Sequence, residues 1–128
     1  MKKEINSVED AFAIEGLDPK AITITGVPER HVESLVALAK LFVVHDHVNA
    51  GWTPDYTKMD RKYEAVHNMG SSSGGGFSFD AHDDWSADSA VGSRLVSQDG
   101  KKARHIANIC HEEYKAFKVY DRTSKLKK

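Results

Sequence analysis

The sequence predicts one α+β domain spanning residues 1–128, and three observations lead to this fold class. The stretches after Pro28 and Gly100 carry apolar residues at spacings of three and four, the period of a helix. Residues 77–85 instead alternate between apolar and polar side chains, as a half-buried strand does, with an exception at Asp83, near which the strand is expected to end or bulge. The length suits one domain with one core. We expect two N-terminal helices, a three-stranded antiparallel meander, and a long C-terminal helix packed on one sheet face.

The N-terminal half predicts the two helices. Ser7 and Asp10 form a capping-box pattern that opens a short first helix, and Gly16 is its stop. Pro28 suits the first turn of a second helix, which Gly51 ends. That helix is apolar around most of its circumference, which is typical of a central helix packed on several sides. We place these residues on one face of it: Val32, Leu35, Val36, Ala39, Phe42 and Val43.

Three stretches are candidates for the strands of the meander. They are residues 63–69, 77–85 and 91–97, whereas residues 21–25 predict an extended segment or a small strand. The glycine- and serine-rich run 70–76 joins the first two strands as a flexible connection.

The last helix is predicted from Gly100 to about Tyr120, with Asp99 or Ser97 as its cap. Residues 122–128 are expected to fray. One apolar stripe on this helix predicts the residues that it buries: Ala103, Ile106, Ala107, Cys110, Tyr114 and Phe117.

Composition excludes several classes of function. Lysine and arginine number 18 against 19 acidic residues, which argues against a dedicated nucleic-acid binder. The single cysteine, Cys110, excludes an intrachain disulfide and a cysteine zinc cluster. The first residues lack the apolar run of a secretory signal, and the most apolar stretch is too short and too charged to cross a bilayer. We therefore expect a cytoplasmic protein without a membrane partner.

The sequence contains seven histidines, a residue type that often binds metal ions, so we consider a metal site. His45 and His47 are two apart on a helix, so their imidazoles point to different sides and cannot hold one ion. A polar end of a buried helix is the simpler interpretation, and a site that combines one of them with His67 or His82 across space stays open. The acidic residues near His82 lack the spacing of a calcium loop. We therefore predict no metal and no cofactor.

The surface that we select from the sequence is a polar sheet face. Strict alternation places Asp80, His82 and Asp84 on the side of their strand away from the core, and Arg94 on the next strand could join them. Two carboxylates beside His82 would raise the pKa of its imidazole. A solvated outer face without a function is the simpler alternative, because one wet face is normal in such sheets.

The chain resembles a family of small uncharacterised proteins from Bacteroides-type bacteria and their phages and prophages. The resemblance is carried by four segments: SVEDAFAIEGLDP, VPERHVESLVALAKLFVVHDHVNAGWTPDY, GGGFSFD and AVGSRLVSQDGKKARHIANICHEEYKAF. Its most specific piece is VGSRLVS followed by the last helix. Related sequences often carry a cysteine and an aromatic residue where this chain has Val96 and Ser97. The family implies a biological setting but no established activity.

These observations favour a non-enzymatic accessory protein of phage or prophage origin in the cytoplasm of the host cell. It would bind a host protein, a phage protein or a small polar ligand through Asp80, His82, Asp84 and Arg94. Two alternatives stay open at this point. One is a metal-dependent hydrolase that uses the histidines and aspartates, and the other is a virion or assembly component that works as a homo-oligomer.

Overall fold

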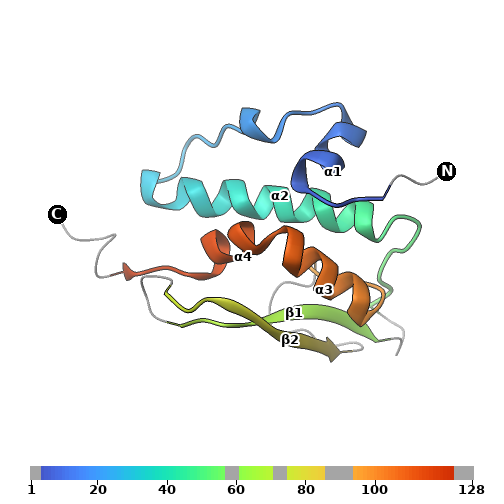
Figure 1. The fold of residues 1–128 in the computed structure, drawn as a ribbon. Helices are drawn as coiled ribbons and strands as arrows, with labels where there is room; N and C mark the ends of the chain where they lie inside the picture. The colour runs from blue at the N-terminus through green and yellow to red at the C-terminus, as the bar shows by residue number, and fades with distance from the viewer. Residues whose placement is uncertain (1–3, 57–60, 71–74, 86–93, 123–128) are drawn as a thin grey trace.

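The fold consists of layers of helices over a small sheet, as the computed structural model shows (Figure 1). The structure describes residues 4–56, 61–70, 75–85 and 94–122, except for the side chains of residues 82–85. Helix α1 lies over α2, α3 and α4 lie beneath α2, and the strands β1 and β2 lie against α3 and α4 on the far side from α2. The elements are α1 (Val8–Glu15), η1 (Pro19–Ala21), η2 (Glu29–His31), α2 (Val32–Val48), β1 (Lys62–Asn68), β2 (Ser78–Trp85), α3 (Gly100–Ile109) and α4 (His111–Lys118).

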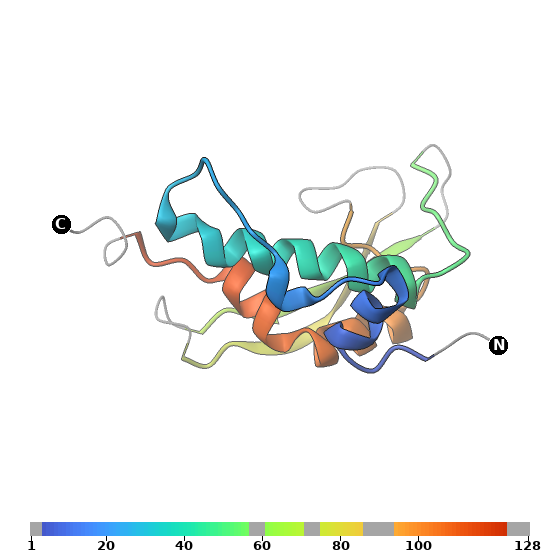
Figure 2. The same cartoon turned by 90° about the horizontal axis from the view of Figure 1, so that it is seen from above.

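The first helix begins and ends where its capping residues predict. The Ser7 hydroxyl accepts a hydrogen bond from the Asp10 backbone N–H at 3.0 Å, which satisfies one of the first N–H groups of α1. Gly16 ends the helix with a φ of 70°, a left-handed conformation that glycine adopts without a steric penalty. Seen from above, α1 lies across the C-terminal part of α2 (Figure 2). The contact of 2.7 Å between His47 and Glu15 joins these two helices.

The central helix α2 does not bury the face that its sequence predicts. Its buried residues are Ala37, Leu41, Val44 and His45, which recur at three- and four-residue spacing. The six residues assigned to the core face from the sequence are only half-buried. Because apolar residues surround this helix, their periodicity does not select one face, and the packing of α4 and α1 decides which side is covered.

The predicted three-stranded meander is wrong. The described residues form a two-stranded antiparallel sheet of β1 and β2, and helices cover one of its faces (Figure 1). Of the third candidate strand, Ser97 makes a single bridge, with backbone hydrogen bonds of 3.0 and 2.7 Å to Tyr63. Ser97 therefore lies beside β1, whereas a meander would have placed it beside β2. Residues 91–93 of that candidate lie outside the described part.

The N-terminal half also differs from the expected pair of helices, since the 3₁₀ helices η1 and η2 accompany α1 and α2. Residues 21–25 form no strand. Residues 71–74 of the predicted flexible connection and 123–128 of the predicted frayed end lie outside the described residues.

The long C-terminal helix is likewise wrong, because it is divided at Cys110 into α3 and α4. Asp99 caps α3 by accepting a hydrogen bond from the Lys102 backbone N–H at 2.8 Å. The predicted stripe is buried from Ala103 to Tyr114, but Phe117 is 37% exposed. The break changes the direction of the chain after Cys110, so the stripe of α3 does not continue in phase to the end of α4.

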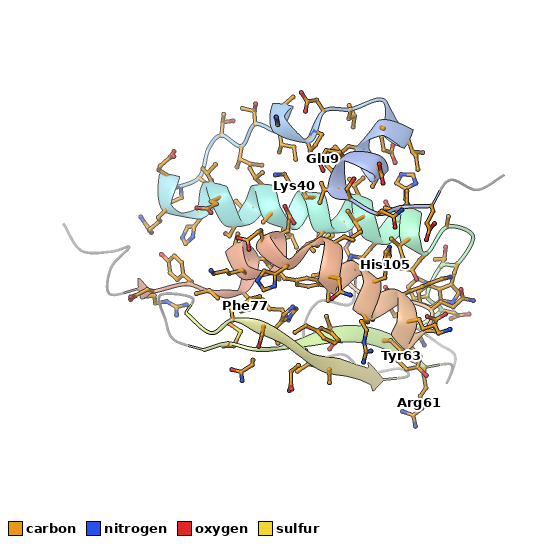
Figure 3. All side chains as sticks on the ribbon, viewed as in Figure 1. Glu9, Lys40, Arg61, Tyr63, Phe77 and His105 are labelled. Atoms are coloured by element: carbon orange, nitrogen blue, oxygen red, sulfur yellow. The ribbon has the colours of Figure 1, made fainter. Side chains whose placement is uncertain are left out.

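The core lies between α2, the α3–α4 pair and the covered face of the sheet. Leu41, Val44, Ile106 and Cys110 are completely buried there. Phe77 precedes β2 and lies between the sheet and α4, with its ring centroid 5.5 Å from that of His111 (Figure 3). Among the described residues, no helix has the length and apolar character that crossing a bilayer requires.

Candidate functional site

A bulge in β2 interrupts the alternation on which the predicted polar face depends. Phe79 pairs with His67 and Ala81 pairs with Val66, so Asp80 is the extra residue of β2 between these two pairs. The register beyond it therefore differs by one from strict alternation. Asp80 is exposed.

The remaining predicted site residues are placed only in part. The backbones of His82 and Asp84 pair with Ala65 and Tyr63, and the side chains of both residues lie outside the described part. The raised pKa expected for the His82 imidazole is therefore not tested. The structure thus leaves the polar-face site a prediction.

Arg94 lies on the other side of β1, in the segment that leads to Ser97. Its guanidinium carbon is 4.1 Å from the centroid of the Phe42 ring on α2, a cation–π contact. Arg94 also lines a cavity of about 470 Å³ at the C-terminal end of α2, together with Asp46 and Trp52. Its described contacts therefore tie it to α2.

The histidines of α2 point to different sides, as helix geometry predicts. The His45 imidazole is buried, and its Nδ1 lies 2.7 Å from the backbone oxygen of Leu41. Burial lowers the pKa of His45 to about 4, although the hydrogen bond to Leu41 and the nearby Asp46 oppose this shift. His47 instead contacts Glu15 near the surface. No group of three or more histidine, cysteine, aspartate or glutamate residues in the described part could hold a metal ion.

A better candidate site is a cavity of about 410 Å³, which we name the β1–α4 cavity. It lies where β1, α4 and the segment carrying Leu95 meet. Most of its wall is apolar, and two charged side chains also reach it. Its described lining consists of Glu64, Ala65, Met69, Leu95, Tyr114, Phe117 and Lys118. A largely apolar cavity of this size with a few convergent polar groups is typical of a site for a small ligand.

Lys118, the last residue of α4, brings an amine to this cavity. Its Nζ lies 3.3 Å from the backbone oxygen of Ala65 and 2.9 Å from Nδ1 of His67, both on β1. It also lies 5.1 Å from the centroid of the Tyr114 ring. Burial lowers the pKa of the Lys118 amine, and the negative charge of Glu64 opposes this effect. The amine is therefore held against the protein wall, although a lysine in the last turn of a helix ordinarily extends into water.

His67 is the partner of this amine and lies within an aromatic cluster. Its ring stacks on Phe77 with a centroid separation of 4.6 Å, and the Tyr114 ring lies at 4.8 Å. Burial lowers the pKa of His67 to about 4, and the nearby charges of Lys118 and His111 lower it further. His67 is therefore neutral near pH 7 and can accept a hydrogen bond at Nδ1. Its Nε2 is buried and has no hydrogen-bond partner among the described residues.

Tyr114 connects the cavity to the core. Its hydroxyl lies 3.4 Å from Nε2 of His45, and burial raises the pKa of the phenol. Cys110, one turn earlier in the chain, is completely buried, and burial raises the pKa of its thiol. The cysteine thus lies in the core, as the apolar stripe of the last helix predicts, and its buried thiol lacks the accessible thiolate that a strong nucleophile needs.

The sequence interpretation missed Lys118, and it considered His67 only as a partner of another histidine in a metal site. For His67 a signal existed, since alternation in the strand candidate 63–69 puts it on the same side as Ala65. For Lys118 a positional signal existed too, because it lies four residues after Tyr114 and therefore on the same side of the last helix; its residue type, however, is ordinarily counted as solvated. The packing of α4 beside β1 then places its amine at the cavity.

Comparison with known proteins adds no further assignment: no family model, no curated protein and no solved structure matches this chain.

Proposed function

We propose that this chain is a non-enzymatic binding protein that takes up a small, largely apolar and uncharged ligand in the β1–α4 cavity. The observation that carries this proposal is the combination of an apolar wall with one cation and one anion, Lys118 and Glu64. The expected phage or prophage setting is part of the proposal and would make the protein an accessory factor in a host cell.

The charges at the cavity favour a neutral ligand over an ion. An anionic ligand would be attracted by Lys118 and repelled by Glu64, and a cationic ligand would meet the opposite pair of forces. The opposing terms leave little net electrostatic gain for either ion, which would also lose its hydration on entering an apolar site. A ligand with an apolar body and one neutral polar group avoids both costs.

The surface position of two wall residues supports access to this cavity. Met69 is 41% exposed and Phe117 is 37% exposed, so the apolar wall continues to the surface. Large apolar side chains left partly in water beside a cavity are typical of a ligand site, because a ligand can remove the remaining apolar surface from water.

The direct test uses N-phenyl-naphthylamine, an uncharged aromatic probe whose fluorescence rises in apolar surroundings. We expect saturable binding to the full chain at one site. Phe117→Ala removes apolar wall and should weaken binding by roughly 3- to 10-fold, given about 25 cal/mol for each Å² of apolar surface that the smaller side chain no longer buries against the probe. Because Phe117 is partly exposed, this variant should fold.

Ile14→Ala is the matched control, because Ile14 is an apolar residue of α1 that is 48% exposed and does not line the cavity. It should bind the probe as the wild-type chain does. Absence of saturable binding, or equal losses in Phe117→Ala and Ile14→Ala, would contradict the proposal.

A further inference from the structure

The Lys118 amine is the cation of the cavity in its resting state, and its hydrogen-bond environment can also hold the neutral form that reacts. A neutral lysine amine carries two N–H groups and one lone pair, whereas the ammonium form carries three N–H groups and no lone pair. The contacts of Nζ with Ala65 O and with His67 Nδ1 provide two acceptors, which match the two donors of the neutral amine. Neutral His67 accepts at Nδ1 only if its proton is on Nε2, the atom without a described partner.

The surroundings of Nζ are also those of a reactive amine. A lysine becomes nucleophilic when an apolar environment disfavours its charged form. Here the amine lies beside the Tyr114 ring and lines a cavity with a largely apolar wall. Burial lowers the pKa of Lys118, which increases the neutral fraction near pH 7. Glu64 acts in the opposite direction, so its effect limits the gain.

We propose that Lys118 captures a small aldehyde or ketone in the β1–α4 cavity as a covalent imine. This proposal rests on the proposed binding function and names the class of its ligand. A carbonyl compound is uncharged, as the charges of the cavity favour, and its polar group is an electrophile. The structure thus assigns Lys118 a reactive role beyond its contacts with β1.

The chemistry needs no oxidant, reductant or metal. The lone pair of Nζ attacks the carbonyl carbon, and the electron pair of the C=O π bond moves to the oxygen, which takes up a proton. Nitrogen loses a proton, and a carbinolamine results. Its hydroxyl group then leaves with a further proton as water, while nitrogen and carbon form the C=N bond and nitrogen loses its second hydrogen. The sum is one amine plus one carbonyl compound giving one imine and one water.

The test traps the imine in the full, folded chain. Benzaldehyde serves as the neutral carbonyl probe, and sodium cyanoborohydride reduces any imine to a stable secondary amine that peptide mass spectrometry locates. Lys115 is the internal control, because it is on the same helix and does not line the cavity. We expect initial labelling of Lys118 roughly ten times faster than that of Lys115, as a desolvated lysine should show.

Two comparisons separate a site effect from other causes. In urea-unfolded protein the ratio of Lys118 to Lys115 labelling should fall to about one, because the cavity is lost. An excess of N-phenyl-naphthylamine should slow labelling at Lys118 and leave Lys115 unchanged. Since these measurements use the wild-type chain, they do not depend on a lysine variant that folds.

The outcomes distinguish this proposal from the binding function. If the probe binds at the cavity but Lys118 reacts no faster than Lys115, imine capture is wrong and binding stands. If the probe does not bind, the binding function fails independently of the labelling result. Preferential labelling of Lys118 that persists unchanged in unfolded protein would also overturn imine capture, because the reactivity would then not arise from the fold.

Discussion

Asn49 is the residue whose replacement tests most sharply how the chain after the sheet is attached to the helices. It follows α2, is 4% exposed, and makes three hydrogen bonds through its side chain. Its Nδ2 donates to the backbone oxygen of His45 and to Oγ of Ser97, both at 3.1 Å. Its Oδ1 accepts from the backbone N–H of Gln98 at 2.9 Å. One side chain thus joins the end of α2 to the segment beside β1.

The cost of Asn49→Ala follows from these hydrogen bonds. A net contribution of about 1 kcal/mol for each hydrogen bond gives a loss of about 3 kcal/mol in the free energy of unfolding. The partly buried N–H of Gln98 also loses its described acceptor, which adds to the cost. Small domains are stable by roughly 5–15 kcal/mol, so this loss should be easily measured. Urea unfolding followed by circular dichroism gives the value.

Two further variants make the interpretation specific. Ser97→Ala removes one of the three bonds and should cost about 1 kcal/mol. Asn68→Ala removes an exposed hydrogen bond from the Gly70 N–H and should cost less than about 1 kcal/mol. If Asn49→Ala unfolds within about 0.5 kcal/mol of the wild-type chain, the attachment of the Ser97 segment to α2 is not as described.

Three further expectations follow from the structure. Gly70→Ala should destabilise the fold more than Gly16→Ala, because both glycines have a positive φ but a Cβ at Gly70 would also lie 2.0 Å from a backbone oxygen. Thermal unfolding of the two variants measures the difference. Because burial lowers the pKa of His45 to about 4, its contribution to stability is complete above about pH 6.5 and is lost as pH falls toward 4, by up to about 3 kcal/mol. Urea unfolding across this pH range checks the sign: the slope should be smaller in His45→Gln than in the wild-type chain, and the part that remains belongs to His67, whose pKa is also lowered to about 4. Ile106→Ala should cost about 2–5 kcal/mol and Phe117→Ala less than about 1.5 kcal/mol, since the first side chain is completely buried and the second is 37% exposed; equal losses in denaturant titrations would place both in the core.

Local signals predicted the points where elements begin and end better than they predicted how the elements pack. Ser7, Gly16 and Asp99 have the conformations and hydrogen bonds of helix caps because capping depends on neighbouring backbone groups alone. The buried face of α2 depends instead on which helices pack around it. Apolar residues on all sides of a helix carry no information about that choice.

A single extra residue in β2, Asp80, is enough to change the faces predicted from alternation. The strand candidate 77–85 was found close to its observed bounds, yet the bulge at Asp80 shifts its register relative to β1. The sequence indicated an end or a bulge near Asp83, where the alternation fails, but the observed bulge is at Asp80, which continues the polar–apolar pattern. The third candidate, residues 91–97, makes only the Ser97 bridge within the described residues, and the backbone that follows it is held by Asn49 through the N–H of Gln98.

The cavity could not be predicted because its residues are distant in the sequence. His67 belongs to β1 and Lys118 to α4, 51 residues apart, and the packing of α4 beside β1 brings them together. The predicted long helix would have continued past Cys110 in one direction. Lys118 would still have lain on the side of Tyr114, four residues earlier, but a lysine at the end of a helix is ordinarily counted as solvated.

The position of ligand binding is tested most directly by a nuclear magnetic resonance titration of the isotope-labelled chain with N-phenyl-naphthylamine. The methyl resonances of Ala65, Met69 and Leu95 should shift together and saturate, because these side chains line the β1–α4 cavity. Those of Ile14 and Val27, which are exposed and do not line it, should remain in place. Saturable shifts at Ile14 or Val27 without shifts at the cavity residues, or no saturable shifts at all, would contradict the proposed binding site.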